Sequence, residues 1–139
     1  MSDVLHVLAD LLREGDDPIA SHVVEPTEAP TFGQLAAGGP RAAAAPEEYA
    51  LVVEAVREGY LLHYGQPRLL ADPDPDLALL AGDYLYALGI ERLARLGDPA
   101  AVRELGELIS DCAQLYVEGR EAEAPARWQA AARAIGGVK

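Results

Sequence analysis

Between residues 47 and 135, apolar side chains recur at intervals of three and four along the sequence. This spacing places them on one face of an α-helix, whereas a half-buried strand needs sustained alternation, which the chain does not show. Proline, glycine and aspartate interrupt the pattern at residues 65–67, 72–76, 97–99 and 119. We therefore expect an all-α protein, built as a small antiparallel bundle of four or five helices.

The interruptions give each expected helix a beginning and an end. Asp76 is the expected N-cap of the helix that begins at residue 77, and Asp98 and Pro99 supply the N-cap and first residue of the next. Gly119 is the expected C-terminal cap of that helix. The expected helices cover residues 3–14, 47–64, 77–96, 99–118 and 121–135.

The segment from residue 19 to residue 46 has little helical periodicity and is rich in proline, glycine and alanine. Only residues 32–37 are expected to form a short helix there. A structureless connection of this length is uncommon inside a compact domain. We therefore divide the chain into an N-terminal helix with a Pro/Gly/Ala-rich arm, residues 1–46, and a helical bundle domain, residues 47–139.

Acidic residues outnumber basic ones, with 23 Asp and Glu against 11 Lys and Arg and a net charge of −12. Such a surface repels phosphate backbones, so a nucleic-acid partner is not expected. No apolar run approaches the roughly 20 residues of a membrane span, and the N-terminus lacks the pattern of a secretory signal. A single cysteine excludes an internal disulfide. We expect a soluble, cytoplasmic protein without a membrane span.

The most apolar segment is LALLAGDYLYALGI, residues 77–90, which carries apolar side chains around nearly the whole expected helix. A helix of this kind is buried or lies in an interface. Its only charge, Asp83, then needs a hydrogen-bond partner. This partner is either a tyrosine, histidine or backbone N–H within the protein, or a ligand. The candidate buried polar or ligand site consists of Asp83, His63, Tyr84 and Tyr86.

The following expected helix also carries a broad apolar stripe. Together the two helices have more apolar surface than one small domain needs, which favours a homodimer or a heteromer. The alternative is the ordinary core of a monomeric bundle. The candidate interface residues are Leu80, Tyr84, Leu88, Leu105, Ile109, Cys112 and Tyr116.

The sequence contains no complete catalytic motif. Its histidines, His6, His22 and His63, do not form a metal-binding motif, and its serines lack a GxSxG setting. Cys112 lies on an apolar stripe and is expected in the core. The alternating aspartates of residues 72–76 resemble the start of a calcium loop, but the glycine and distal glutamate of such a loop are missing. We assign no catalytic residue, no cofactor and no metal ligand, and do not expect an enzyme.

Three short segments carry a family resemblance: LLH at residues 61–63, LAGDYL at residues 80–85, and the pair Glu118-Gly119. Residues 77–109 resemble the trans-polyprenyl diphosphate synthases, in which a helix containing AGDYL is common and an EG-containing turn follows the next helix. LLH resembles the lead-in to the first aspartate-rich motif of that family. The resemblance covers about residues 47–120 and implies part of the isoprenoid synthase fold.

The departures from the family concern its metal site. Where the family has DDxxD, this chain has YGQPR at residues 64–68, and no second aspartate-rich motif follows. Without these carboxylates, magnesium ions cannot be held on a diphosphate. The resemblance therefore implies a short, non-catalytic relative, like the small subunit that supports a catalytic partner in two-component synthases.

In that family the matched helix pair lies at the dimer interface. We therefore expect an accessory or regulatory subunit that docks on a prenyl diphosphate synthase catalytic subunit through residues 77–96 and 99–118. Two alternatives stay open. One is a self-associating helical protein of unrelated role. The other is a small-molecule binder with a pocket near Asp83.

Overall fold

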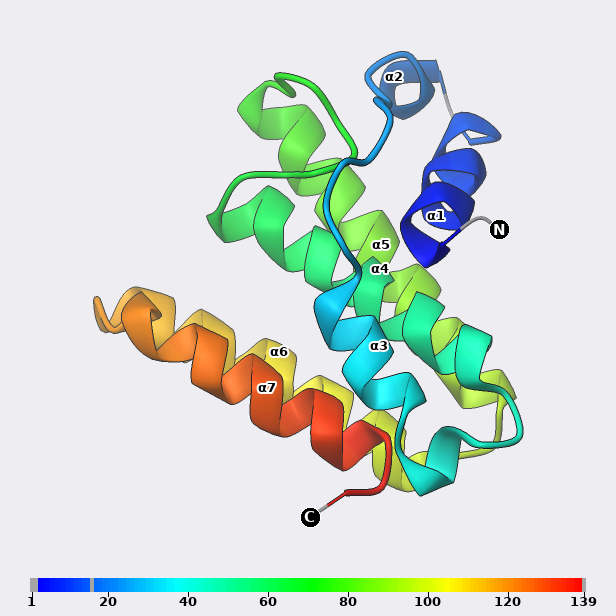
Figure 1. Ribbon diagram of the computed structural model, residues 1–139. Helices are drawn as coiled ribbons and strands as arrows, with labels where there is room; N and C mark the ends of the chain where they lie inside the picture. The colour runs from blue at the N-terminus through cyan, green and yellow to red at the C-terminus, as the bar shows by residue number, and fades with distance from the viewer. Residues whose placement is uncertain (1–2, 16, 139) are drawn as a thin grey trace.

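A computed structural model describes residues 3–15 and 17–138, and within these residues the regular structure is helical (Figure 1). The expected all-α class is confirmed, but the described residues form seven α-helices where the sequence predicts four or five. Short 3₁₀ turns lie at Pro40–Ala42 and Glu121–Glu123. The helices are α1 (Val4–Arg13), α2 (Asp17–Ala20), α3 (Thr31–Ala37), α4 (Pro46–Tyr64), α5 (Pro75–Arg95), α6 (Pro99–Val117) and α7 (Ala124–Ile135).

The caps of α1 and α6 follow the sequence signals. The carboxylate of Asp3 accepts the first free N–H groups of α1, and that of Asp98 accepts the N–H of Ala101 at 3.1 Å. These side chains satisfy donors that the first turn of a helix leaves without partners. Gly97 and Gly119 follow the ends of α5 and α6 with φ of 72° and 70°, a conformation that favours glycine.

The start of α5 differs from the expected one. Its N-cap is Asp74 rather than Asp76, because the Asp74 carboxylate accepts the N–H of Leu77 at 2.8 Å. Pro75 then occupies the first helical position, where its missing N–H has no cost. The helix therefore begins two residues before the position that the sequence predicts.

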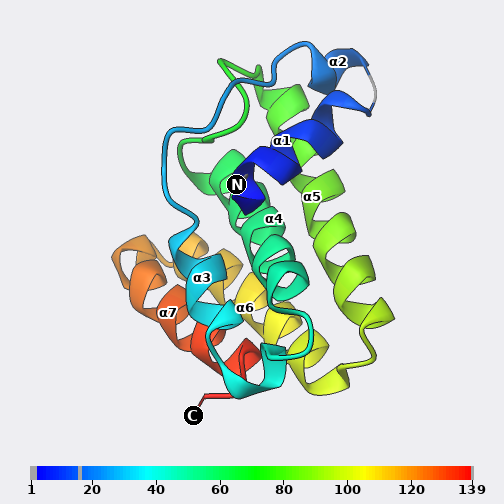
Figure 2. The same ribbon diagram turned by 45° about the vertical axis from the view of Figure 1, so that its right-hand side comes forward.

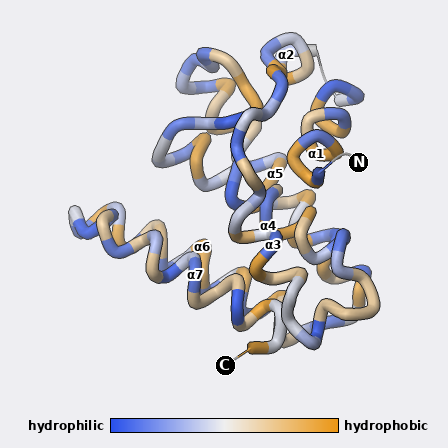
Figure 3. Tube along the Cα trace, in the orientation of Figure 1, coloured by the Kyte–Doolittle hydropathy of each residue, from blue (hydrophilic) through white to orange (hydrophobic). Residues whose placement is uncertain are grey.

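The centre of the molecule is α4, which packs against α5, α3 and α1. Figures 1 and 2 show α5 running antiparallel beside α4 and forming one edge of the bundle. The second antiparallel pair, α6 and α7, contacts α3 as well, and its tip projects away from the rest of the molecule. Figure 3 shows that this tip is mostly hydrophilic, as expected for its exposed position.

Two apolar cores lie on opposite sides of α4. The first is shared with α3, α5, α6 and α7, and the second with α1 and α5. Because α4 contributes to both, its buried residues surround most of the helix. Large members of the first core include Val52, Val56, Leu105, Trp128 and Ile135, and those of the second include Leu5, Leu8, Leu62, Leu69 and Leu85.

The arm of residues 19–46 is more ordered than its sequence suggests. Its helix α3 packs against both α4 and α7. Beyond α3, the Arg41 N–H donates to the carbonyl of Gly136 at 2.8 Å. A Cβ atom at Gly39 would lie 2.2 Å from the same carbonyl oxygen, so this close passage requires glycine. The arm is therefore packed on the bundle.

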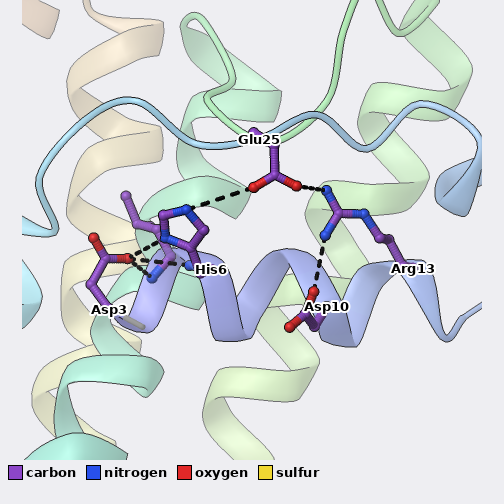
Figure 4. A network of polar contacts seen from close by, with 6 residues as sticks. Asp3, His6, Asp10, Arg13 and Glu25 are labelled. Carbon is purple, nitrogen blue, oxygen red and sulfur yellow. Dashed lines mark hydrogen bonds and ion pairs between the residues drawn. The ribbon is translucent and has the colours of Figure 1, made fainter. Parts of the chain in front are cut away.

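Polar contacts also join the start of this arm to α1 (Figure 4). Glu25 accepts from Arg13 Nη2 at 2.6 Å, and its second oxygen lies 3.6 Å from His6 Nε2. Arg13 also donates to Asp10 at 2.9 Å. These side chains are largely exposed, so each pair contributes no more than about 1 kcal/mol.

Among the helices described, none is both long enough and apolar enough for a membrane crossing.

Candidate functional site

The predicted group around Asp83 comes together where α4 and α5 touch. His63 Nε2 lies 3.3 Å from Asp83 Oδ1 and 3.3 Å from the carbonyl oxygen of Leu79. The ring of Tyr86 meets the His63 ring edge to face at 5.1 Å. Gly82 makes room for this arrangement, because a Cβ atom there would lie 2.3 Å from the His63 ring.

The burial of this group differs from the expectation. The Asp83 side chain is 66% exposed, so it keeps its hydration and is not the buried carboxylate that the apolar flanks suggest. Tyr84 is exposed and lies on the outer face of α5. His63 and Tyr86 are the members packed between the helices. The group is therefore a surface Asp–His contact above a packed ring pair.

A continuous chain of aromatic rings extends from this point through the bundle. Neighbouring ring centroids lie between 4.8 Å (Tyr64 to Tyr116) and 5.9 Å (His63 to Tyr64) apart. Such tilted and edge-on contacts add to the free energy gained by burying the rings. The members are Phe32 on α3, Tyr60, His63 and Tyr64 on α4, Tyr86 on α5, Tyr116 on α6 and Trp128 on α7.

Beside these rings lies a buried charge cluster that the sequence analysis missed. Glu54 and Glu58 are both fully buried on α4, one turn apart and on the same face. Arg68, in the connection between α4 and α5, is only 6% exposed and lies against both carboxylates. The available signal was a pair of glutamates at i and i+4 within residues 50–62, a mostly apolar stretch whose only other charge is Arg57.

Each carboxylate oxygen of the cluster accepts a hydrogen bond. Glu54 accepts from Arg68 Nη1 at 2.6 Å and from the Gly33 N–H at 2.7 Å. Glu58 accepts from Arg68 Nε at 2.9 Å, and its second oxygen accepts the N–H groups of Arg68 and Leu69. Both carboxylates are therefore held by partners within the fold. The cluster joins α3 and the loop after α4 to α4 itself.

The charges in the cluster perturb each other. Burial by itself lowers the pKa of Arg68, but Glu54 and Glu58 outweigh it and hold that pKa above its ordinary value.

A second arginine, Arg57, lies over the rings of Phe32 and Trp128, at 5.0 Å from each ring centroid. Burial, together with the neighbouring Arg68 charge, lowers the pKa of Arg57. The cation–π contacts with the rings compensate part of its lost hydration.

The candidate interface residues fall into two sets. Leu105 and Cys112 are buried in the first core, and Leu88 and Ile109 pack against the cores, so these side chains serve the fold of the chain itself. Leu80 and Tyr84 on α5 and Tyr116 on α6 are exposed, and so is Leu79, the neighbour of Leu80 in the sequence. Within the described residues, no group of three or more His, Cys, Asp or Glu could hold a metal ion.

Comparison with known proteins adds no relative. The chain matches no protein-family model, and no curated protein or solved structure is significantly similar to it. Function is therefore inferred from the residues and contacts of the chain itself. The most distinctive of these are the buried charge cluster and the exposed apolar residues of α5.

Proposed function

We propose that this chain is a non-catalytic helical protein that docks on a second helical protein through the outer face of α5. The observation that carries the proposal is the exposure of Leu80 and Tyr84, at 57% and 42%, one turn apart on the same helix face. Leu79, equally exposed, widens the patch. Covering such side chains at an interface gains roughly 25 cal/mol for each Å² of apolar surface buried. We call Leu79, Leu80 and Tyr84 the α5 patch.

The charge of the chain favours a different protein over a second copy as the partner. Each copy carries a net charge of −12, and two such copies repel each other. The carboxylates of Asp76 and Asp83 lie beside the α5 patch on exposed positions of the same helix. A matching partner surface has an apolar centre with Lys or Arg at its rim.

The resemblance of residues 47–120 to the polyprenyl diphosphate synthases gives the class of partner, a catalytic subunit of such a synthase. The α5 patch lies within the segment that carries the resemblance. The buried carboxylates support a non-catalytic role, because Glu54 and Glu58 are bound by Arg68 and backbone N–H groups. The chain would act by binding and shaping its partner.

Co-purification with a polyprenyl diphosphate synthase from the source organism, followed by native mass spectrometry of the complex, tests this function. We expect a heteromer whose affinity falls about tenfold or more in the double variant Leu80→Ser/Tyr84→Ser, because central apolar contacts dominate binding. Both positions are exposed, so the variant should fold. Val117→Ser is the matched control, since Val117 is an exposed apolar residue at the tip of α6.

Full retention of the complex by the double variant would refute docking through α5. A chain that stays monomeric with the purified synthase present, at micromolar concentrations, would refute the proposed partner. A homodimer that the double variant abolishes would also refute the accessory role, and would establish the self-associating alternative.

A further inference from the structure

A cavity of about 370 Å³ opens between α1, α3 and the first turns of α4, and none of the α5 patch residues lines it. Its volume lies within the range of about 300–1,000 Å³ that small-molecule sites occupy. The apolar part of its wall includes Val4 and Val7 from α1, Ala37 from α3, and Ala50 and Leu51 from α4. Three helices therefore form a concave apolar surface that could seat the body of a small organic molecule.

The polar residues that line the cavity are mostly acidic. Asp3, Glu47 and Glu48 contribute carboxylates, against one cation, Arg92. Arg92 Nε lies 3.3 Å from Glu48, so these two charges compensate each other and leave Asp3 and Glu47 as the excess carboxylates. Asp3 accepts the N–H groups at the start of α1. Glu47 is exposed and has no ion-pair partner among residues 3–15 and 17–138. The carboxylates repel an anion and attract a cation.

We propose that this cavity binds a small amphipathic organic cation. The apolar body would lie against Val7 and Leu51, and the ammonium group would face Glu47. The Gln34 side chain also lines the cavity and offers both a donor and an acceptor to a polar substituent. A docked protein helix is a poorer fit, because a helix with its side chains is about 10 Å wide and needs a long groove.

Three probes with the same phenylbutyl body test the preference for charge: 4-phenylbutylamine, 4-phenylbutanol and 5-phenylpentanoate. Titration of the full chain with each, followed by amide chemical shifts, gives both the affinity and the location. We expect the amine to bind at the cavity about fivefold or more tighter than the alcohol, and the carboxylate, 5-phenylpentanoate, to bind weakest. Added salt should reduce the difference between amine and alcohol, because it screens exposed charges.

Two variants test the location. Glu47→Gln should weaken the amine about threefold to fivefold and leave the alcohol unchanged, whereas Glu107→Gln, at an exposed glutamate of α6, should change neither. Val7→Trp should weaken the binding of all three probes, because Val7 is exposed at the cavity and the indole ring of tryptophan would fill the space. Thermal unfolding of each variant confirms that the chain is folded.

Equal binding of the three probes would refute the charge preference. Amine binding that survives Val7→Trp, in a folded variant, would refute the cavity as the site. The Leu80→Ser/Tyr84→Ser variant should bind the amine as the native chain does. A result that refutes the cation site would therefore leave the proposed docking through α5 unaffected.

Discussion

Arg68 contacts Glu58 through both its side chain and its backbone. Its Nε donates to Oε1 of Glu58 at 2.9 Å, and its own N–H donates to Oε2 at 2.8 Å. Nη1 of the same arginine donates to Glu54 at 2.6 Å. Because both glutamates belong to α4, these bonds fix the path of the connection that leads to α5. Buried pairs of this kind add little net stability but are costly to break.

Replacement of Arg68 by alanine should therefore destabilise the fold strongly. The change leaves Glu54 and Glu58 buried without their cation, which costs about 3–5 kcal/mol. Urea unfolding of the native chain and the variant measures the loss. Arg95→Ala is the matched control, because Arg95 pairs with Glu91 on the exposed side of α5 and its loss should cost less than about 1 kcal/mol. Similar losses for both variants would show that the cluster has no special importance.

Glycine-to-alanine substitutions should have opposite effects at two helical positions. At Gly33, a Cβ atom would lie 2.8 Å from the carbonyl oxygen of Ala50 and 2.8 Å from Glu54 Cγ. Gly33→Ala should therefore cost about 1–3 kcal/mol, since neither neighbour can move freely. Gly106 on α6 has no neighbour within 4 Å of the added atom, so Gly106→Ala should stabilise by up to about 1 kcal/mol. Thermal unfolding distinguishes the two, and the same sign at both positions would contradict this packing.

The contact between α4 and α5 should show coupling between Gly82 and His63. Gly82→Ala places a Cβ atom 2.3 Å from the His63 ring and should separate the helices at a cost of about 1–3 kcal/mol. In the double variant Gly82→Ala/His63→Ala the ring is gone, so the loss should be smaller than the sum of the single losses. A cycle of urea unfolding measurements gives the coupling. Tyr84→Ala replaces His63→Ala in the control cycle, where additive losses are expected because Tyr84 is exposed.

Local signals in the sequence predict much of this fold. The starts of α1 and α6 depend on Asp3 and Asp98, which act within one turn of the chain. The start of α5 is ambiguous because its region, Asp-Pro-Asp-Pro-Asp, offers more than one Asp-Pro pair. The helix α3 confirms the short helix expected at residues 32–37, but its position against α4 depends on a bond from Gly33 to Glu54, which is 21 residues away. Contacts of that length are not encoded in local spacing.

The candidate sites depended more on tertiary packing. The apolar flanks of Asp83 are compatible with either side of α5 facing the core, and the position of α4 and α1 decides that Asp83 is exposed. Along one stripe of α6, Leu105 is buried while Tyr116 is exposed near the projecting tip. Glu54 and Glu58 were recognisable as a pair, but their cation, Arg68, lies beyond the end of the helix. Helical periodicity gives the faces of a helix without giving its neighbours.

The pH dependence of stability should report the contact between Tyr49 and Asp98. The Tyr49 hydroxyl donates to Asp98 Oδ2 at 2.7 Å. Burial, reinforced by the Asp98 carboxylate, raises the pKa of Tyr49 from its ordinary value of 10.0 to about 12. Between pH 10 and pH 12, Tyr49 therefore keeps its proton in the folded chain and loses it in the unfolded chain. The free energy of unfolding therefore falls as the pH rises from about 10 to about 12.

Tyr49→Phe removes this titration and should flatten the fall. At pH 7 the variant should be about 1 kcal/mol less stable because it loses one hydrogen bond, and the gap should narrow above pH 10. Burial also raises the pKa values of Tyr60 and Tyr86, which titrate in both chains. The informative quantity is therefore the difference in free energy of unfolding between the native chain and Tyr49→Phe. Urea unfolding at pH 7, 10 and 11 measures it, with Tyr84→Phe as a control at an exposed tyrosine. A gap between native chain and Tyr49→Phe that stays constant over this range would show that Asp98 does not hold the Tyr49 proton.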